Sequence, residues 1–352
     1  MKPTLSHVMK ALIVCVLTAF AAQGSALPSA AGYRIPQSQP KDQSKDQGKQ
    51  TAASKAEQDA AAKVQMAADV PAKVAAAGEF VKKYPKSSQR TQVLTYVSRE
   101  VEKMQDAAQR IAQLESLLTV FKEPSDGAVI KPILIDAYFN AERPDDGFRV
   151  ATAYVSENPN EIAARIQIIR QGVEQAKKRN AKYIQISQES GLKAVELIEA
   201  GKKPAMLDDA GWSEYQTKWL PTLYQWLGMI SMMTGNKADA KAKVDKAMSL
   251  NADDPFTFAL AGSLVEDEYQ QIANEYKSAS PGPARDAILQ QAYMKMDDVI
   301  DKYAHAVGLS EGKAAYQQLH DQLLPDLQRY YAYRHGGKSD GIQQLIDKYK
   351  KQ

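Results

Sequence analysis

The chain has 352 residues, of which 44% are hydrophobic and 25% charged, so it is long and apolar enough to bury a sizeable core. Its formal net charge of +3 is nearly balanced, which argues against nucleic acid or an anionic membrane surface as the main partner. The chain contains one cysteine, Cys15, so a disulfide within the chain is excluded.

Residues 1–26 have the pattern of a secretory signal peptide. Lys2 and Lys10 give a positive start, residues 11–22 are apolar, and Gly24-Ser25-Ala26 supplies small residues for cleavage. The apolar run is too short to cross a membrane as a helix. We therefore expect a mature protein that is periplasmic or secreted, with no integral membrane span.

Cys15 raises the alternative of a lipoprotein. The preceding Val14 is not the small residue that a lipobox uses, and the apolar run continues past the cysteine, so lipidation is disfavoured. The next segment, residues 27–53, is rich in Gln, Lys and Ser and poor in apolar residues. Such a composition buries too little surface to offset chain entropy, so this segment is expected to be a disordered tether.

From Ser54 to the end of the chain, residues 54–352, the apolar pattern has the period of helices and no alternation typical of strands. Pro, Gly and Asn residues separate the helical segments. Pro132 is expected near the start of its helix, and Pro221 is expected to kink or restart a helix. After an Ala-rich helical segment that begins at residue 54, helices are predicted at residues 88–104, 106–121, 128–141, 145–157, 161–180, 182–200, 209–234, 237–249, 255–278, 283–305, 310–335 and 339–349.

The three tryptophans lie in the helix predicted at 209–234, together with a tyrosine. Trp212, Tyr215, Trp219 and Trp226 recur on one side of that helix at 100° per residue. Such a stripe could stack against sugar rings or anchor a partner, but it could also be core beneath a neighbouring helix.

Residues 221–254 carry a repeat motif. The motif begins with an aromatic residue and a Leu-Gly pair, continues with a glycine in the turn, and ends with three small or bulky residues at fixed spacing. The pattern begins again at Pro255, after 34 residues. Ser231 stands where the motif has a large residue. The residues that carry the motif are Tyr224, Leu227, Gly228, Gly235, Ala240, Val244 and Ala247, and then Gly262 in the second unit.

This motif resembles the tetratricopeptide repeat, as found in exported bacterial members of that family. The resemblance implies an all-α fold, a right-handed α-solenoid of irregular helical hairpins. It also implies a scaffold whose first helices line a concave face that binds proteins or peptides. Carrying the ligand-facing positions of the family onto this chain gives a candidate partner site. It consists of Gln225, Met229, Met232, Met233, Ser263, Glu266 and Asp267.

No catalytic, metal or cofactor motif is present. His305, His320 and His335 recur every 15 residues, which would separate neighbours by about 22 Å along a helix, too far for a shared metal. The leading hypothesis is therefore a non-catalytic scaffold that binds protein or peptide in the cell envelope.

Two alternatives remain open. The chain could be a structural envelope component that self-associates into a homo-oligomer, or a glycan-binding accessory module that uses the stripe from Trp212 to Trp226. If binding lies outside the candidate site, the C-terminal helices around Tyr330, Tyr331 and Tyr333 are the next place to look.

Overall fold

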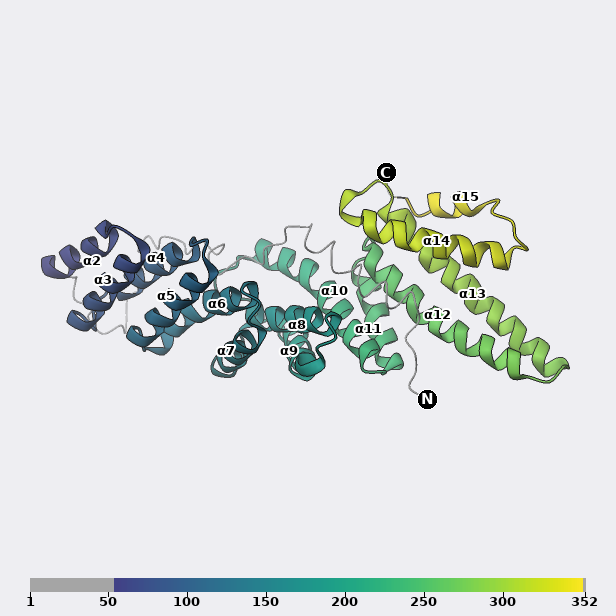
Figure 1. The fold of residues 1–352 in the computed structure, drawn as a ribbon, viewed down its shortest axis with the longest axis horizontal. Coiled ribbons are helices and arrows are strands. Elements are labelled where there is room, and N and C mark those ends of the chain that lie inside the picture. The colour runs from purple at the N-terminus through teal and green to yellow at the C-terminus, as the bar shows by residue number, and fades with distance from the viewer. Residues whose placement is uncertain (1–53, 351–352) are drawn as a thin grey trace. The chain divides into compact units, whose positions relative to one another are not determined.

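A computed structural model describes residues 54–350, so the predicted signal peptide and tether (1–53) lie outside the described residues. Within that range the chain is all-α, with no strand (Figure 1). The described residues form two compact units. The N-terminal unit holds residues up to Gln171 together with Pro204–Met206, and the C-terminal unit holds the rest. Each unit is described separately.

The N-terminal unit consists of helical hairpins. From α2 to α7 each helix packs on the next in the chain, α3 also packs on α5, and α4 also packs on α6. Apolar residues from successive helices form one continuous core, which includes Leu94, Leu114 and Tyr138. The helices of this unit are α2 (Lys55–Met66), α3 (Val70–Lys83), α4 (Arg90–Glu102), α5 (Ala107–Val120), α6 (Pro124–Asn140), α7 (Pro144–Glu157) and the first part of α8 (Ile162–Lys177).

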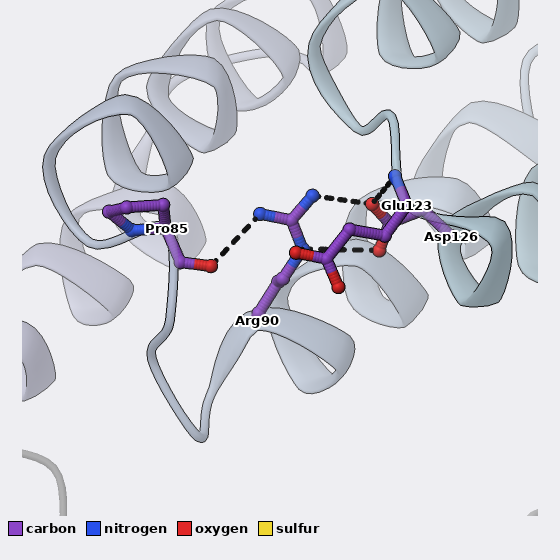
Figure 2. A network of polar contacts seen from close by, with 4 residues as sticks. All are labelled: Pro85, Arg90, Glu123 and Asp126. Carbon is purple, nitrogen blue, oxygen red and sulfur yellow. Dashed lines mark hydrogen bonds and ion pairs between the residues drawn. The ribbon is translucent and has the colours of Figure 1, made fainter.

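A buried ion pair joins α4 to α6 in the N-terminal unit (Figure 2). The Nη2 of Arg90 lies 2.5 Å from Oδ2 of Asp126, and its Nε lies 3.2 Å from Oδ1. Arg90 also donates to the carbonyl oxygen of Pro85. Asp126 accepts from the backbone N–H of Glu123, as the second half of a capping box that begins α6. The Asp126 carboxylate therefore both caps the start of α6 and holds Arg90 of α4 against it.

The C-terminal unit repeats the hairpin arrangement with longer helices. The α12–α13 hairpin is the longest in the described chain, with α14 packed along α13 and α15 against α13 (Figure 1). After the end of α8, this unit consists of α9 (Ile184–Glu199), α10 (Asp209–Met233), α11 (Lys237–Leu250), α12 (Pro255–Ser278), α13 (Pro283–Ser310), α14 (Gln317–Arg334) and α15 (Ile342–Asp347).

The two motif glycines of the C-terminal unit lie where paired helices approach closely. A Cβ on Gly228 of α10 would lie 2.8 Å from the Val244 side chain of α11. A Cβ on Gly262 of α12 would lie 2.4 Å from the ring of Tyr303 on α13. Since Gly228 and Gly262 are 34 residues apart, the spacing read from the sequence corresponds to the same contact in two successive hairpins.

Other motif residues occupy the packing positions expected of them. Ala240 and Ala247 are fully buried in α11, and Leu227 is fully buried in α10. Gly235 has φ +81° and ends α10, a conformation that favours glycine. Tyr224 is half-buried, and its hydroxyl donates to Glu199 of α9.

Ser231 departs from the expectation that its site has room for a large residue. It is 1% exposed, and its Oγ lies 2.5 Å from a carboxylate oxygen of Asp239. A leucine there would be crowded, and Asp239 would lose the hydrogen bond from Ser231 while keeping its ion pair with Lys243. The hydroxyl therefore belongs to the contact between α10 and α11.

The structure differs from the predictions at the starts of two helices and at one proline, whereas the helix predicted at 209–234 agrees with α10 within one residue. Helix α6 begins at Pro124, so Pro132 lies inside it rather than near its start. Helix α10 runs through Pro221 without a break. The segment predicted as one helix at 310–335 is divided at Gly312, which has φ +72°, and α14 begins only at Gln317. In the first two cases, tertiary packing outweighs the local cost of an internal proline.

Among residues 54–350, no helix is both long enough and apolar enough to span a lipid bilayer.

Candidate interaction surface

The candidate partner site from the sequence is mostly interior. Five of its seven side chains are buried, so the expected exposed groove is wrong for these five. The reason is visible in α10, where every residue from Leu223 to Met232 except Tyr224 is buried, so the helix is enclosed on nearly all sides. The buried five are Gln225, Met229, Met232, Ser263 and Glu266.

The remaining two residues, Met233 and Asp267, are half-exposed. Asp267 forms an ion pair with Lys237 at 3.3 Å. Two half-exposed side chains without the other five do not make a continuous binding surface. The predicted acidic rim is also interrupted, because Glu268 is paired with Lys295 at 2.5 Å.

Gln225 is buried because it connects two neighbouring hairpins. Its Nε2 donates to Asp254 at 2.6 Å and to the Thr257 hydroxyl at 2.9 Å. Asp254 is the N-cap of α12 and accepts from the backbone N–H groups of Phe256 and Thr257. Gln225 thus fixes the start of α12 against α10.

Glu266 has a similar structural role one step further along the chain. Its carboxylate, 3% exposed, accepts hydrogen bonds from Tyr303 of α13 at 2.8 Å and Tyr330 of α14 at 2.6 Å. Burial raises the pKa of Glu266, and the two tyrosine hydroxyls oppose this shift because they stabilise the carboxylate. One side chain therefore joins three helices.

The raised pKa of Glu266 predicts a pH dependence of stability. A carboxyl whose pKa is raised by folding stabilises the fold most below its ordinary value of 4.5, and this stabilisation is lost as pH rises through the folded-state value. We expect the wild-type unfolding free energy, measured relative to a Glu266→Gln variant, to fall as pH rises above 4.5. Guanidinium denaturation from pH 4 to 8 measures the difference. A flat difference would contradict the prediction.

The aromatic stripe of α10 is also largely core. Trp212 is half-exposed, but Tyr215, Trp219 and Trp226 are buried. Neighbouring rings contact one another along the helix, with centroids 5.7 to 6.3 Å apart. The expectation of an exposed trench that could hold sugar rings is therefore wrong, because only Trp212 is accessible.

An exposed aromatic surface does occur at the C-terminal helices. Tyr330 and Tyr331 are buried, but Tyr333 at the end of α14 is 70% exposed. Tyr269 of α12 packs edge-on against Tyr330. Burial raises the pKa of Tyr269, and electrostatic interaction with Tyr333 and Tyr293 raises this pKa further. Three tyrosines from three helices therefore gather at one place.

Arg334 ends α14 at this surface. Its guanidinium lies over the Tyr293 ring, 5.0 Å from the centroid, and pairs with Asp297 at 2.8 Å. Asp297 lies at the middle of α13, so the hairpin continues beyond the end of α14 (Figure 1). Helical spacing predicts that Tyr276, seven residues after Tyr269, and Leu289, four residues before Tyr293, lie on the same side of that continuation. The guanidinium of Arg285 lies over the Tyr276 ring, 4.5 Å from the centroid.

We call these residues the tyrosine surface. All except Tyr333 are half-exposed, and all lie on long helices rather than on loops. Exposed aromatic side chains held on rigid elements are typical of the centres of protein interfaces. The tyrosine surface consists of Tyr269, Tyr276, Leu289, Tyr293 and Tyr333.

Of the residues of this surface, only Tyr333 was singled out from the sequence. The seven-residue spacing of Tyr269 and Tyr276 and the four-residue spacing of Leu289 and Tyr293 were available as signals. However, the same spacing describes core residues. What separates the two cases is which helix packs against the tyrosines. The helix predicted at 310–335 ends within one residue of α14, but its bounds do not tell along which part of the α12–α13 hairpin it lies.

No group of three or more His, Cys, Asp or Glu residues in the described part of the chain is arranged to hold a metal ion. His305 is instead stacked between Phe258 and Tyr349, with ring centroids 3.6 and 4.1 Å away.

Comparison of the chain with family models found no match, and comparison with curated proteins found none either.

Proposed function

We propose that this chain is an exported, non-catalytic scaffold that resembles the tetratricopeptide repeat proteins and binds protein or peptide in the cell envelope of a bacterium. Support for export comes from the signal-like residues 1–26. Support for the class comes from the repeat motif and from the close helix contacts at Gly228 and Gly262. The binding role is assigned to the tyrosine surface instead of the buried methionines.

The observation that carries this proposal is the exposure of Tyr333. A tyrosine that is 70% exposed, beside two further tyrosines on different helices, leaves aromatic area in water that a partner would bury. Tyrosine also offers a hydroxyl for hydrogen bonding at the edge of such a contact. Such an aromatic surface on rigid helices supports the recognition of another protein.

Site-specific photo-crosslinking tests this proposal. We expect benzoylphenylalanine at position 333 to form a discrete adduct with an envelope protein in living cells, because that side chain is at the surface. The same amino acid at Gln328, an exposed position of α14, serves as the control and is expected to form none. Equal adducts at both positions, or none at 333, would overturn the assignment of binding to this surface.

Self-association is the second candidate function. The half-exposed apolar residues beyond the end of α14 favour it, because a two-helix hairpin cannot bury its own apolar face completely. An adduct at position 333 with the mass of two copies of the chain would support self-association over a different partner.

A further inference from the structure

Helix α14 is a third helix that packs on the α12–α13 hairpin, and its apolar spacing indicates which kind of helix fits there. Its buried residues Leu319, Leu323 and Leu327 recur every four positions, and Tyr330 follows three positions later. Tyr330 contacts both Tyr269 of α12 and Tyr303 of α13. An amphipathic helix with apolar residues at this spacing therefore already packs along one half of the hairpin.

The other half has no such cover from α14. Helix α14 ends at Arg334 beside Asp297, which leaves about 14 residues of α13, or about 21 Å, beyond it. Tyr276, Leu289 and Tyr293 lie along this length and are half-exposed. Apolar side chains of the hairpin thus continue past the end of α14.

We propose that the tyrosine surface binds an amphipathic helix of a partner protein, which lies end to end with α14 along the α12–α13 hairpin. This inference rests on the proposed binding function and names the class of partner. Two packed helices offer ridges and grooves to a third helix. An extended peptide would gain little, because residues 54–350 contain no strand edge that could pair with its backbone.

The charges of the hairpin indicate the chemistry of that helix. Residues 268–298 contain five acidic and three basic side chains, and two of the acids are already paired, Glu268 with Lys295 and Asp297 with Arg334. Asp286 is exposed near the tip, and Arg334 shows how a guanidinium is bound here, by a tyrosine ring and a carboxylate together. The partner helix is therefore expected to carry leucine-like residues four positions apart, followed by arginine or lysine.

A peptide derived from α14 is a suitable probe because its apolar spacing fits the hairpin. The helical probe is residues 317–334 with Pro325→Ala, which removes the internal proline. A second probe carries proline at two positions and cannot be helical. Fluorescence anisotropy of the labelled peptides with the full chain measures binding, and circular dichroism reports whether the bound peptide is helical.

The surface is tested with matched double variants. Tyr276→Glu with Leu289→Glu places charge on the tyrosine surface. Gln271→Glu with Gln291→Glu adds the same charge at exposed positions of the same two helices. Both proteins are expected to melt like wild type. We expect the first variant to weaken binding of the helical probe at least tenfold and the second to change it less than twofold.

The outcomes separate this inference from the proposed function. If only the proline probe binds, and the Tyr276→Glu, Leu289→Glu variant abolishes that binding, the function stands and the helical partner is overturned. If neither probe binds but wild type dimerises through the same residues, the occupant is a second copy and the inference is again overturned. If neither probe binds and crosslinking at position 333 also fails, both proposals are overturned.

Discussion

Gly262→Ala is expected to destabilise the C-terminal unit by about 1–3 kcal/mol, although alanine is the better helix former. The added Cβ would lie 2.4 Å from the ring of Tyr303, which is fully buried and hydrogen-bonded to Glu266. The ring has no free space to move into, so the α12–α13 contact must open. Guanidinium denaturation, with hydrogen exchange of α12 and α13, measures the loss.

Gly78→Ala is the matched control. Gly78 is also a buried helical glycine, but a Cβ there would meet Val120 at an ordinary 3.7 Å. Helix propensity then dominates, and this substitution is expected to stabilise by up to about 1 kcal/mol. The same effect for both substitutions would contradict the contact described for Gly262.

Arg90→Leu is expected to cost about 3–5 kcal/mol in the N-terminal unit, because it leaves the carboxylate of Asp126 buried without its cation. The Asp126 side chain is 3% exposed, and after the substitution it would keep the hydrogen bond from the backbone N–H of Glu123 (Figure 2). Asp126→Ala should cost less, since Glu123 lies 3.9 Å from Arg90 and can take over part of the pairing.

Two further variants test whether the destabilisation by Arg90→Leu comes from the unpaired charge of Asp126. Arg90→Leu combined with Asp126→Leu removes both charges, so its unfolding free energy should lie closer to wild type than that of Arg90→Leu alone. Arg99→Leu, at an exposed position of the same helix, is expected to stay within about 0.5 kcal/mol of wild type. If Arg90→Leu behaves like Arg99→Leu, the ion pair does not hold the two helices together.

Much of the fold could be predicted from the sequence because helices in this chain are bounded by strong local signals. Pro255 and Pro283 stand in the first turns of α12 and α13, and Asp106 and Asp208 cap α5 and α10. These signals act within one turn, so they can be read without knowing the tertiary structure. The predicted helix at 255–278 has the same bounds as α12.

The binding site could not be predicted in the same way. Met229 and Met232 recur at a spacing that fits either an exposed groove or a core. The packing of α9 and α11 on α10 decides between them. Whether a residue is exposed depends on which other helices pack against it, and these can be far away in the sequence. The tyrosine surface depends on the point where α14 ends, which is set by a turn and not by the tyrosines.

The buried polar contacts between alternate helices limit how such a chain can change in evolution. Arg90 needs Asp126, Gln225 needs Asp254, and Glu266 needs Tyr330, and each pair belongs to two specific hairpins. Deletion or duplication of one hairpin would bring mismatched polar groups together in the core. These hairpins are therefore not interchangeable modules, and the chain is expected to diversify by substitution at its surface while its number and order of hairpins stay fixed.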